Sequence, residues 1–188
     1  MSVPAKLDRR FRDTAAAEGL LDVAYDVVDS PLGPLYVAVS RAGLCTVLFD
    51  PEPERETERL ARTYGARILA SKRPTDETRR ELDEYFEGKR RRFDLPVDLR
   101  LAREFGRRVL KELVRVPYGE LTTYGALAAR AGHPRAARAV GSVMNRNPVP
   151  IVVPCHRVVG STGKLVGYGG GLDRKLALLR LEGSAPIA

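Results

Sequence analysis

The residues best suited to chemistry lie in one short segment near the end of the chain. The apolar, strand-like run of residues 150–158 places Cys155 between Pro154 and His156, and the 188-residue chain has only two cysteines and two histidines. Proline fixes its own φ and biases the preceding residue to an extended conformation, so we expect Cys155 at a stiffened bend. A thiol presented in this way is a candidate nucleophile, provided that a neighbour lowers its pKa or takes its proton.

The rest of the composition indicates an intracellular protein. Cys45 alternates with apolar neighbours, and we expect it to be a buried structural thiol. Two distant cysteines do not make a disulfide framework, and free thiols suit a reducing compartment, so we expect a cytoplasmic protein, associated with the nucleoid if prokaryotic. No apolar run is long enough to cross a membrane. Residues 1–19 are polar and charged without a secretory apolar core, and we interpret them as a mobile N-terminal arm.

The net charge of +8 is concentrated in the half that holds Cys155. Residues 1–99 carry 17 Lys and Arg against 19 Asp and Glu, a net charge of −2, whereas residues 100–188 carry 15 against 5, a net charge of +10. A basic half of this kind is either a solvated surface or a binding site for a polyanion, of which nucleic acid is the simplest.

The first half predicts a small α/β domain over residues 20–99, including a linker. Three short apolar runs separated by Gly- and Pro-containing turns predict a short antiparallel sheet, followed by two amphipathic helices and a last extended piece. The expected strands are residues 21–28, 35–39 and 44–49, the expected helices residues 54–64 and 75–86, and the extended piece residues 93–99.

The second half, residues 100–188, predicts a mainly helical domain, so that the fold class of the whole chain is α+β. Helices are expected over residues 103–116, from Thr122 or Thr123 to 131, over 134–145 and over 172–181, with a flexible glycine-rich loop at 167–171. The two short helices joined through Gly132 form a candidate helix-turn-helix. Small residues on the second helix of the pair fit either tight packing within the domain or close approach to a DNA groove.

Six motifs, taken together in order and spacing, resemble the O6-alkylguanine-DNA alkyltransferases, also called methylated-DNA–protein-cysteine methyltransferases. The resemblance covers roughly residues 103–183, and the first half matches only in outline. The motifs are Pro-Tyr-Gly-Glu at 117–120, Ala-Ala-Arg-Ala-Val-Gly at 136–141, Asn-Pro at 147–148, Pro-Cys-His-Arg-Val at 154–158, Gly-Tyr-Gly-Gly-Gly at 167–171 and Leu-Glu-Gly at 181–183.

The resemblance implies DNA repair by direct damage reversal. The alkyl group of O6-alkylguanine, and of O4-alkylthymine, would move irreversibly to Cys155 after base flipping, so that each molecule acts once. His156 would act as the base through a water, and Glu182 would orient its imidazole. Asn147 would hold the turn near the cysteine, and Tyr124 would contact the guanine and help to neutralise it as it leaves.

The resemblance also implies a minor-groove complex with double-stranded DNA that contains alkylated guanine. Arg138 would fill the stack in place of the flipped nucleotide, with the carbonyl of Val158 and the backbone N–H of Gly169 near the guanine. The expected DNA-binding residues are Arg138, Arg135, Ala137, Gly141 and Thr123, and the expected substrate-binding residues are Val158, Tyr168, Gly169 and Gly170.

Some positions depart from the family pattern. Gly106 and Leu110 replace a glutamine and a tryptophan that are common in the helix opening the second domain. The first half has one cysteine and no histidine, so we expect no zinc site there. We also expect no other cofactor, and a monomer in solution. Two other classes fit parts of the pattern: a DNA-binding regulator that flags lesions without transfer, and a cysteine hydrolase. The Cys155–His156 pair argues against the first class, and the basic half argues against the second.

Overall fold

The computed structural model describes residues 4–184, which form two compact units. The first unit holds the described residues up to Glu84 together with Asp94–Asp98, and the second holds Tyr85–Phe93 and the described residues from Leu99 onward. The sequence predicts that the N-terminal domain with its linker ends at residue 99 and that a separate C-terminal domain follows, and this boundary stays a prediction. Helix α1, Ala5–Ala17, lies in the segment interpreted as an arm, and the mobility of that segment also stays a prediction.

A four-stranded sheet in the order β3-β2-β1-β4 forms the centre of the first unit. Strands β1 to β3 are antiparallel neighbours, as the short turns between the three apolar runs predict, whereas β4 runs parallel to β1. The sequence did not predict β4, because three residues are too few to show a period. The bounds are β1 Val23–Val28, β2 Leu35–Ser40, β3 Gly43–Phe49 and β4 Ile68–Ala70.

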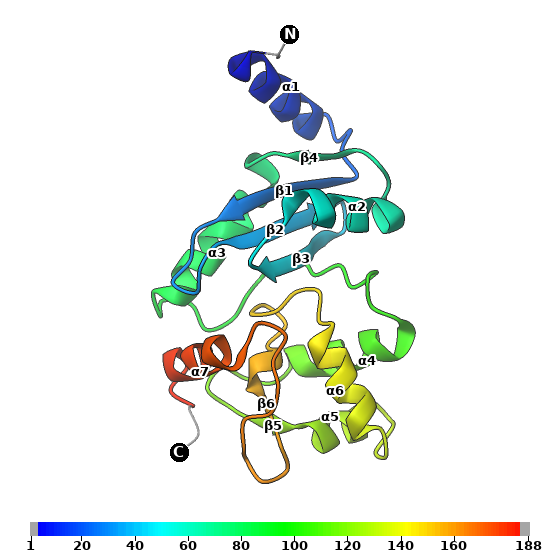
Figure 1. Cartoon of the computed structure of the whole chain (residues 1–188), viewed down its shortest axis with the longest axis vertical. Helices are drawn as coiled ribbons and strands as arrows, with labels where there is room; N and C mark the ends of the chain where they lie inside the picture. Colours follow the sequence, from blue (N-terminus) through cyan, green and yellow to red (C-terminus); the bar gives the residue numbers. More distant parts are fainter. Residues whose placement is uncertain (1–3, 185–188) are drawn as a thin grey trace. The chain divides into compact units, whose positions relative to one another are not determined.

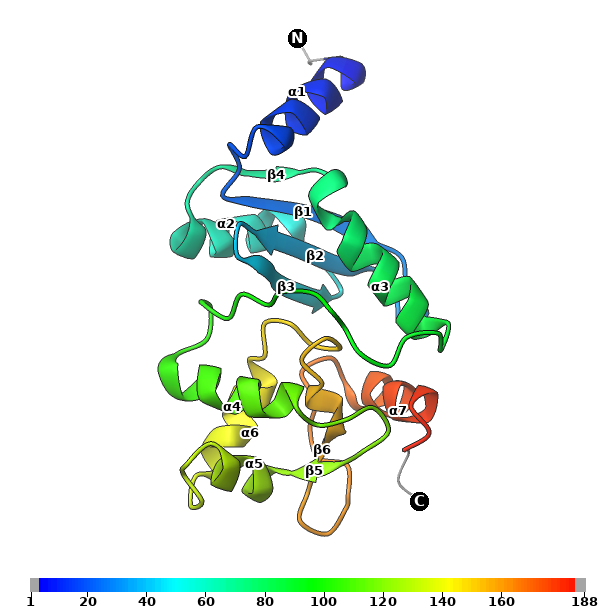
Figure 2. The ribbon, with the colours of Figure 1, turned by 180° about the vertical axis from the view of Figure 1, so that it is seen from behind.

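Two helices cover opposite faces of this sheet (Figures 1 and 2). They are α2, Pro53–Tyr64, and α3, Asp76–Phe86, which a short 3₁₀ turn η1, Arg73–Thr75, precedes. With both faces covered, four consecutive residues of β2, at positions 35–38, have no exposed surface. Burial on both faces explains why β2 is apolar along most of its length.

The predicted extended piece near residue 99 pairs with the start of β3. The Leu44 amide donates to the Pro96 carbonyl at 2.8 Å, and the Asp98 amide donates to the Leu44 carbonyl at 2.9 Å. Gly43 has a φ of +126°, and a Cβ at this position would collide with the Pro96 carbonyl. This close approach therefore requires glycine at position 43.

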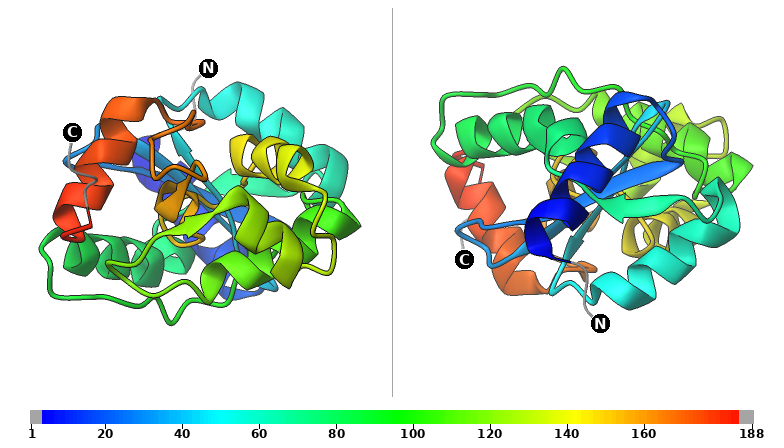
Figure 3. Two further views of the ribbon diagram at one scale, coloured as in Figure 1. Left: turned by 90° about the horizontal axis from the view of Figure 1, so that it is seen from below. Right: turned by 90° about the horizontal axis from the view of Figure 1, so that it is seen from above.

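The second unit is mainly helical, with a two-stranded parallel ladder between β5 and β6. The 3₁₀ turn η2 and β6 lie between α7 on one side and the pair α5 and α6 on the other (Figures 1 and 3). The elements are α4 Glu104–Val114, β5 Thr122–Thr123, α5 Tyr124–Arg130, α6 Ala137–Asn145, η2 Cys155–Arg157, β6 Val158–Val159 and α7 Leu172–Leu181.

The helix-turn-helix consists of α5 and α6. Thr123 caps α5, since its hydroxyl accepts from the Ala126 amide at 3.1 Å, and Gly132 ends the turn after α5 with a φ of +81°. Helix α6 begins three residues later than predicted, because residues 134–136 form a turn closed by the Ala136 amide and the His133 carbonyl at 2.9 Å.

The architecture confirms the predicted α+β class with a small sheet and a helix-turn-helix. Among residues 4–184, no helix has the length and apolar character needed to span a membrane.

Candidate active site

The segment that leads into Cys155 is a set of turns rather than the strand-like run expected from its sequence. Asn147 closes it: its Nδ2 donates to the Val153 carbonyl at 2.8 Å, and its Oδ1 accepts from the Val149 amide at 3.1 Å. Ile151 has a φ of 73°, which is strained for a β-branched side chain and is held by the buried surroundings. The predicted role of Asn147 in holding this turn agrees with these contacts.

Cys155 lies at a sharp bend, as its flanking proline predicts. Pro154 has φ −81° and ψ 65°, and the Cys155 amide donates to the Val153 carbonyl at 2.8 Å, which is an inverse γ-turn. The thiol is 4% exposed, and burial raises its pKa. A hydrogen bond with Asn147 and the charge of Lys175 act in the opposite direction without cancelling the effect. The thiol therefore needs a base to react at neutral pH.

His156 follows this thiol in the chain and has one ring nitrogen engaged and one without a partner among residues 4–184. The ring is fully buried, and Nε2 lies 2.8 Å from Glu182 Oε1. Because an ionised carboxylate only accepts hydrogen bonds, the ring proton is assigned to Nε2. Nδ1 is also buried and makes no hydrogen bond within the described part of the chain. Burial lowers the pKa of His156 despite the opposing effect of Glu182, so the imidazole is neutral at pH 7 and Nδ1 can accept a proton.

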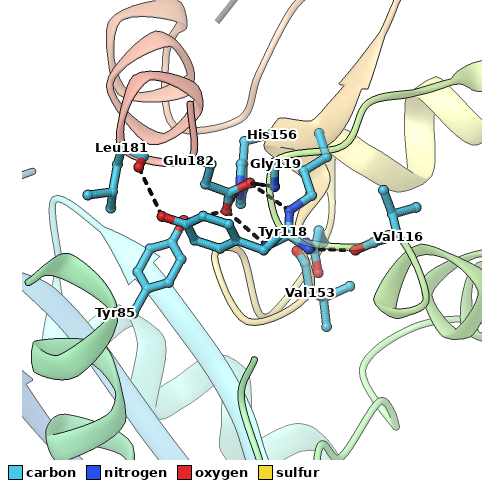
Figure 4. A network of polar contacts seen from close by, with 10 residues as sticks. Tyr85, Val116, Tyr118, Gly119, Val153, His156, Leu181 and Glu182 are labelled. Atoms are coloured by element: carbon cyan, nitrogen blue, oxygen red, sulfur yellow. Dashed lines mark hydrogen bonds and ion pairs between the residues drawn. The ribbon is translucent and has the colours of Figure 1, made fainter. Parts of the chain in front are cut away.

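Glu182, which ends α7, accepts hydrogen bonds from three other elements (Figure 4). Tyr85 Oη donates to Oε1 at 2.7 Å, and Arg157 donates to Oε2 through Nε at 2.8 Å and to Oε1 through NH2 at 2.9 Å. The Gly119 amide lies 3.3 Å from Oε2. Burial by itself would raise the pKa of Glu182, but the hydrogen bonds from His156 and Arg157 lower it below its usual value. Glu182 is therefore a fixed anion next to the imidazole.

Arg157 neutralises this buried anion, and the sequence analysis assigned it no role. Its NH1 donates to the Val116 carbonyl at 2.5 Å, and its guanidinium lies 5.9 Å from the centre of the Tyr118 ring. Tyr118 in turn donates to the Leu181 carbonyl at 2.9 Å. The signal that could have indicated Arg157 is its place in the Cys-His-Arg motif, two residues after the thiol.

Lys175 is a second basic residue that the sequence analysis missed. Its side chain is fully buried on α7, and Nζ donates to the carbonyls of Val158 at 2.6 Å and Val166 at 3.0 Å. Burial lowers the pKa of Lys175 to about 8, while Cys155 acts in the opposite direction. The sequence could have indicated this role, because Lys175 lies three and four residues before Leu178 and Leu179, on the apolar face of α7. A lysine buried on such a face needs hydrogen-bond partners.

The helix-turn-helix contributes an open groove of about 460 Å³ in the second unit. The predicted residues Thr123, Tyr124, Ala137, Arg138 and Gly141 all line this groove. Its remaining lining residues are Gly125, Asn145, Ser161, Val166 and Gly167.

Two glycines on this side of the second unit differ in the room around them. A Cβ on Gly141 would make an ordinary contact with the Tyr124 ring at 3.9 Å, whereas a Cβ on Gly169 would be crowded at 3.3 Å from the Asn145 carbonyl. Burial and the proximity of Cys155 raise the pKa of Tyr124, which therefore keeps its proton at neutral pH.

The other predicted residues lie around this groove. Arg135 is exposed before α6 and does not line the groove. Tyr168 is near the thiol, since burial and then Cys155 raise the pKa of its hydroxyl. Gly169 is exposed and Gly170 is half-buried in the loop before α7. Across residues 4–184, no group of three or more His, Cys, Asp or Glu side chains is arranged to hold a metal ion.

Taken together, the site is a buried cysteine followed by a histidine whose imidazole is hydrogen-bonded to a buried carboxylate, next to the groove of a helix-turn-helix. Nucleophile, base and orienter are arranged in this way in other enzymes that use a side-chain nucleophile. Two family models match the chain: the DNA-binding domain of 6-O-methylguanine DNA methyltransferase over residues 104–184, and the ribonuclease-like domain of the same protein over residues 23–99. The chain belongs to this family of methylated-DNA–protein-cysteine methyltransferases. The predicted family is confirmed, and with it the enzyme class and the assignment to DNA repair.

Individual relatives agree with the family models. The chain is 46% identical to the methylated-DNA–protein-cysteine methyltransferase of Mycolicibacterium paratuberculosis over 85% of this chain and 92% of the relative. It is 44% identical to the Methanosarcina barkeri protein of the same name, over 84% and 96%. The crystal structure of Mycobacterium tuberculosis OGT in complex with DNA superposes with a TM-score of 0.75 at 41% identity, covering 86% of this chain and 94% of that one.

Proposed function

We propose that the protein repairs DNA by moving the alkyl group of O6-alkylguanine to the sulfur of Cys155 in a single turnover. The observation that carries this proposal is the unpaired Nδ1 of a buried, neutral His156 whose other nitrogen is held by Glu182. His156 directly follows Cys155, the cysteine of the Pro-Cys-His-Arg motif that the chain shares with the family.

The proposed reaction begins with the proton of the thiol. It passes to His156 Nδ1 through a water, and Glu182 stabilises the imidazolium that forms, since the two groups are already hydrogen-bonded at 2.8 Å. The base is necessary because even a free thiol of pKa ~8.5 is only a few per cent ionised near pH 7, and burial raises the pKa of Cys155.

The thiolate then attacks the alkyl carbon. A C–S bond forms, the C–O6 bond breaks, and its electron pair goes to the guanine. Tyr124 keeps its proton at neutral pH and lines the groove, so it is placed to donate that proton to the guanine as it leaves. Solvent then returns a proton to Tyr124 and takes from His156 the one that came from the thiol, so that both side chains end neutral and the guanine has gained one proton overall. Nothing in this sequence of steps cleaves the thioether, so the protein stops after one transfer.

The groove of the helix-turn-helix would bind the DNA, with α6 lying in the minor groove of the duplex. The small residues Ala137 and Gly141 leave room for a close approach of the backbone, and Arg138 lines the same groove. A base inside a duplex hides its O6 atom from a protein thiol, so the nucleotide must be flipped, and Arg138 would fill the stack that it leaves. Thr123, which lines the groove, and Arg135, which precedes α6, would also contact the DNA.

The flipped guanine would be read mainly by the backbone. The Val158 carbonyl, which Lys175 holds at 2.6 Å, faces the guanine amino group in this proposal, and the loop containing Tyr168, Gly169 and Gly170 supplies donors to its O6 edge. We extend the proposal to O4-alkylthymine, to action as a monomer, and to a cytoplasmic or nucleoid location, which the family resemblance supports.

Mass spectrometry after mixing with duplex DNA that contains O6-methylguanine tests the proposal. One equivalent of protein should gain one methyl group and then stop, and peptide mapping should place the adduct on Cys155. Several turnovers per molecule, or an adduct on Cys45, would refute the transfer as proposed.

A further inference from the structure

Tyr85 contributes a hydroxyl to the active site from the last turn of α3, far from the cysteine motif in sequence. It belongs to the second unit and is fully buried. Its Oη donates to Glu182 Oε1 at 2.7 Å, the same oxygen that lies 2.8 Å from His156 Nε2 (Figure 4). The tyrosine and the histidine therefore share one carboxylate oxygen.

The ring of Tyr85 is fixed by other aromatic rings, so its hydroxyl does not turn away. The ring centres of Phe93 and Phe86 lie 5.2 Å and 5.5 Å from that of Tyr85, and Tyr118 meets it edge to face at 6.1 Å. Burial, followed by the charge of Glu182, raises the pKa of Tyr85, so the hydroxyl stays protonated and acts as a donor throughout the working pH range.

We propose that Tyr85 is a positioning residue for alkyl transfer: its hydroxyl fixes Glu182 Oε1, withdraws charge from it, and so sets how strongly Glu182 supports protonation of His156. The inference rests on the proposed role of His156 as the base. It also places a positioning residue before residue 104, where the match to the family's DNA-binding domain begins.

Removal of this hydroxyl has a definite sign. Glu182 would lose one of its donors and would bear more charge on the oxygen that faces His156 Nε2. A more basic carboxylate stabilises the imidazolium, so His156 would take up a proton at a higher pH. The carboxylate would also be held less firmly, which slows transfer even where the imidazole is neutral.

The other groups that face this pair stay in place when only the Tyr85 hydroxyl is removed. They come from several elements, and their contributions to the pKa values of His156 and Glu182 are common to the two proteins under comparison. They are Arg157 of η2, Lys175 of α7 and the Gly119 amide between α4 and β5. Tyr118 meets the guanidinium of Arg157 through its ring face, which Tyr118→Phe retains, and Arg91 meets the same ring at 5.7 Å.

The test compares Tyr85→Phe with Tyr118→Phe in the full chain. Both variants lose one phenol hydroxyl from the same aromatic cluster, but the Tyr118 hydroxyl donates to the Leu181 carbonyl at 2.9 Å and not to Glu182. The imidazole of His156 is followed by NMR, which is straightforward because His133 is the only other histidine. We expect the midpoint of His156 titration to rise by about half to one pH unit in Tyr85→Phe and to stay unchanged in Tyr118→Phe.

The rate of single-turnover transfer is measured on the same proteins. In Tyr85→Phe, the fall of the rate on the acid side should move to higher pH with the NMR midpoint, and the plateau rate should drop about 3- to 10-fold, part of the value of one hydrogen bond to a charged group. Equal His156 midpoints in wild type and Tyr85→Phe would overturn the inference, even if that variant were less stable. A midpoint that moves without any change in the rate profile would instead show that His156 is not the base.

A second substitution keeps the test decisive if Tyr85→Phe does not fold. 3-Fluorotyrosine at position 85 retains the hydroxyl and the ring contacts but makes the hydroxyl a stronger donor. The His156 midpoint should then move to lower pH, opposite to the shift expected for Tyr85→Phe. A midpoint that stays at the wild-type value would overturn the inference.

Discussion

Each of the two units contains one buried cysteine, and the two thiols differ in their neighbours rather than in their burial. Cys45 has no exposed surface, and its Sγ donates to the Ala38 carbonyl at 3.2 Å. Burial, followed by the charge of Asp98, raises its pKa to about 12. Thr46, Tyr64 and Arg59 favour its thiolate without offsetting burial, as Asn147 and Lys175 do at Cys155, which is almost as buried.

The difference teaches that a buried thiol needs a base beside it, since hydrogen-bonding groups and a positive charge act on both thiols and do not offset burial at either one. Both histidines of the chain lie after residue 99, and His156 is adjacent to Cys155. Cys45 sits in a strand whose neighbours supply packing but no such base. The same residue type is therefore structural in one unit and, in our proposal, the alkyl acceptor in the other.

The largest expected effect comes from replacing each thiol by a hydroxyl. Cys155→Ser should abolish transfer while leaving DNA binding intact, because a hydroxyl is far less ionised and less nucleophilic at neutral pH. Cys45→Ser should leave the transfer rate largely unchanged and cost about 1–3 kcal/mol of stability from burying a hydroxyl in an apolar site. Gel-shift binding and single-turnover assays on the two proteins measure this contrast. Substantial transfer by Cys155→Ser would remove the distinction between the thiols.

The second effect compares a buried carboxylate from each unit. Glu182→Gln should slow transfer by about 10²- to 10⁴-fold, because a neutral amide stabilises the imidazolium poorly, as in other base–orienter pairs. It should also cost about 3–5 kcal/mol, since Arg157 is left buried without its counter-charge.

Asp98→Asn is the matched control in the first unit. Asp98 accepts from the Ser40 hydroxyl at 2.6 Å, and its loss should cost about 1–3 kcal/mol without slowing transfer by the folded protein. Denaturant unfolding and transfer rates separate the two variants. Equal transfer rates for both would show that Glu182 serves only the fold.

The third prediction distinguishes a residue that acts on DNA binding and base flipping from one that acts on the transfer reaction. Arg138→Ala should slow repair of duplex DNA about 10- to 100-fold, because unstacking a base costs a few kcal/mol and the inserted arginine offsets part of it. Reaction with free O6-benzylguanine needs no flipping and should be unaffected.

Arg79→Ala serves as the control for removing a positive charge. Arg79 forms a surface ion pair with Asp76 at 2.6 Å in the first unit, and its loss should change neither reaction. An equal slowing of both substrates by Arg138→Ala would place Arg138 in the chemistry or the fold.

The smallest effect is the dependence of transfer on pH. Burial lowers the pKa of His156 from the ordinary imidazole value of about 6.5, so the base stays neutral near pH 7. Measured from about pH 7.5 downward, the rate with free O6-benzylguanine should therefore fall at a lower pH than an ordinary imidazole would give, as His156 takes up a proton. Over the same range Cys45, with its pKa of about 12, should acquire no alkyl group by mass spectrometry. A half-maximal rate at or above pH 6.5 would contradict the assignment of a lowered pKa to the base.

Local sequence patterns predicted much of the fold. Apolar runs bounded by turn residues identified β1 to β3, and amphipathic spacing identified α2 to α4. The threonine and glycine signals located α5 within a residue or two, and α7 follows the predicted glycine-rich loop. The failures have physical causes: β4 is only three residues long, and α6 begins late because residues 134–136 turn before the helix. Residues 150–157 have strand-like apolar content, but the Asn147 contacts fold them into turns.

The sequence by itself determined the family and the candidate nucleophile, base and orienter, because their motifs are local and keep their spacing along the chain. The tertiary structure alone decided which buried charges compensate one another. Three contacts show this. Arg157 pairs with Glu182, Lys175 donates to the Val158 carbonyl, and Tyr85 donates to the Glu182 oxygen that faces His156, each across a stretch of intervening chain. Such pairings have no period or spacing along the chain, since they depend on where folding brings the elements together, and the low dielectric of the interior then makes each contact matter.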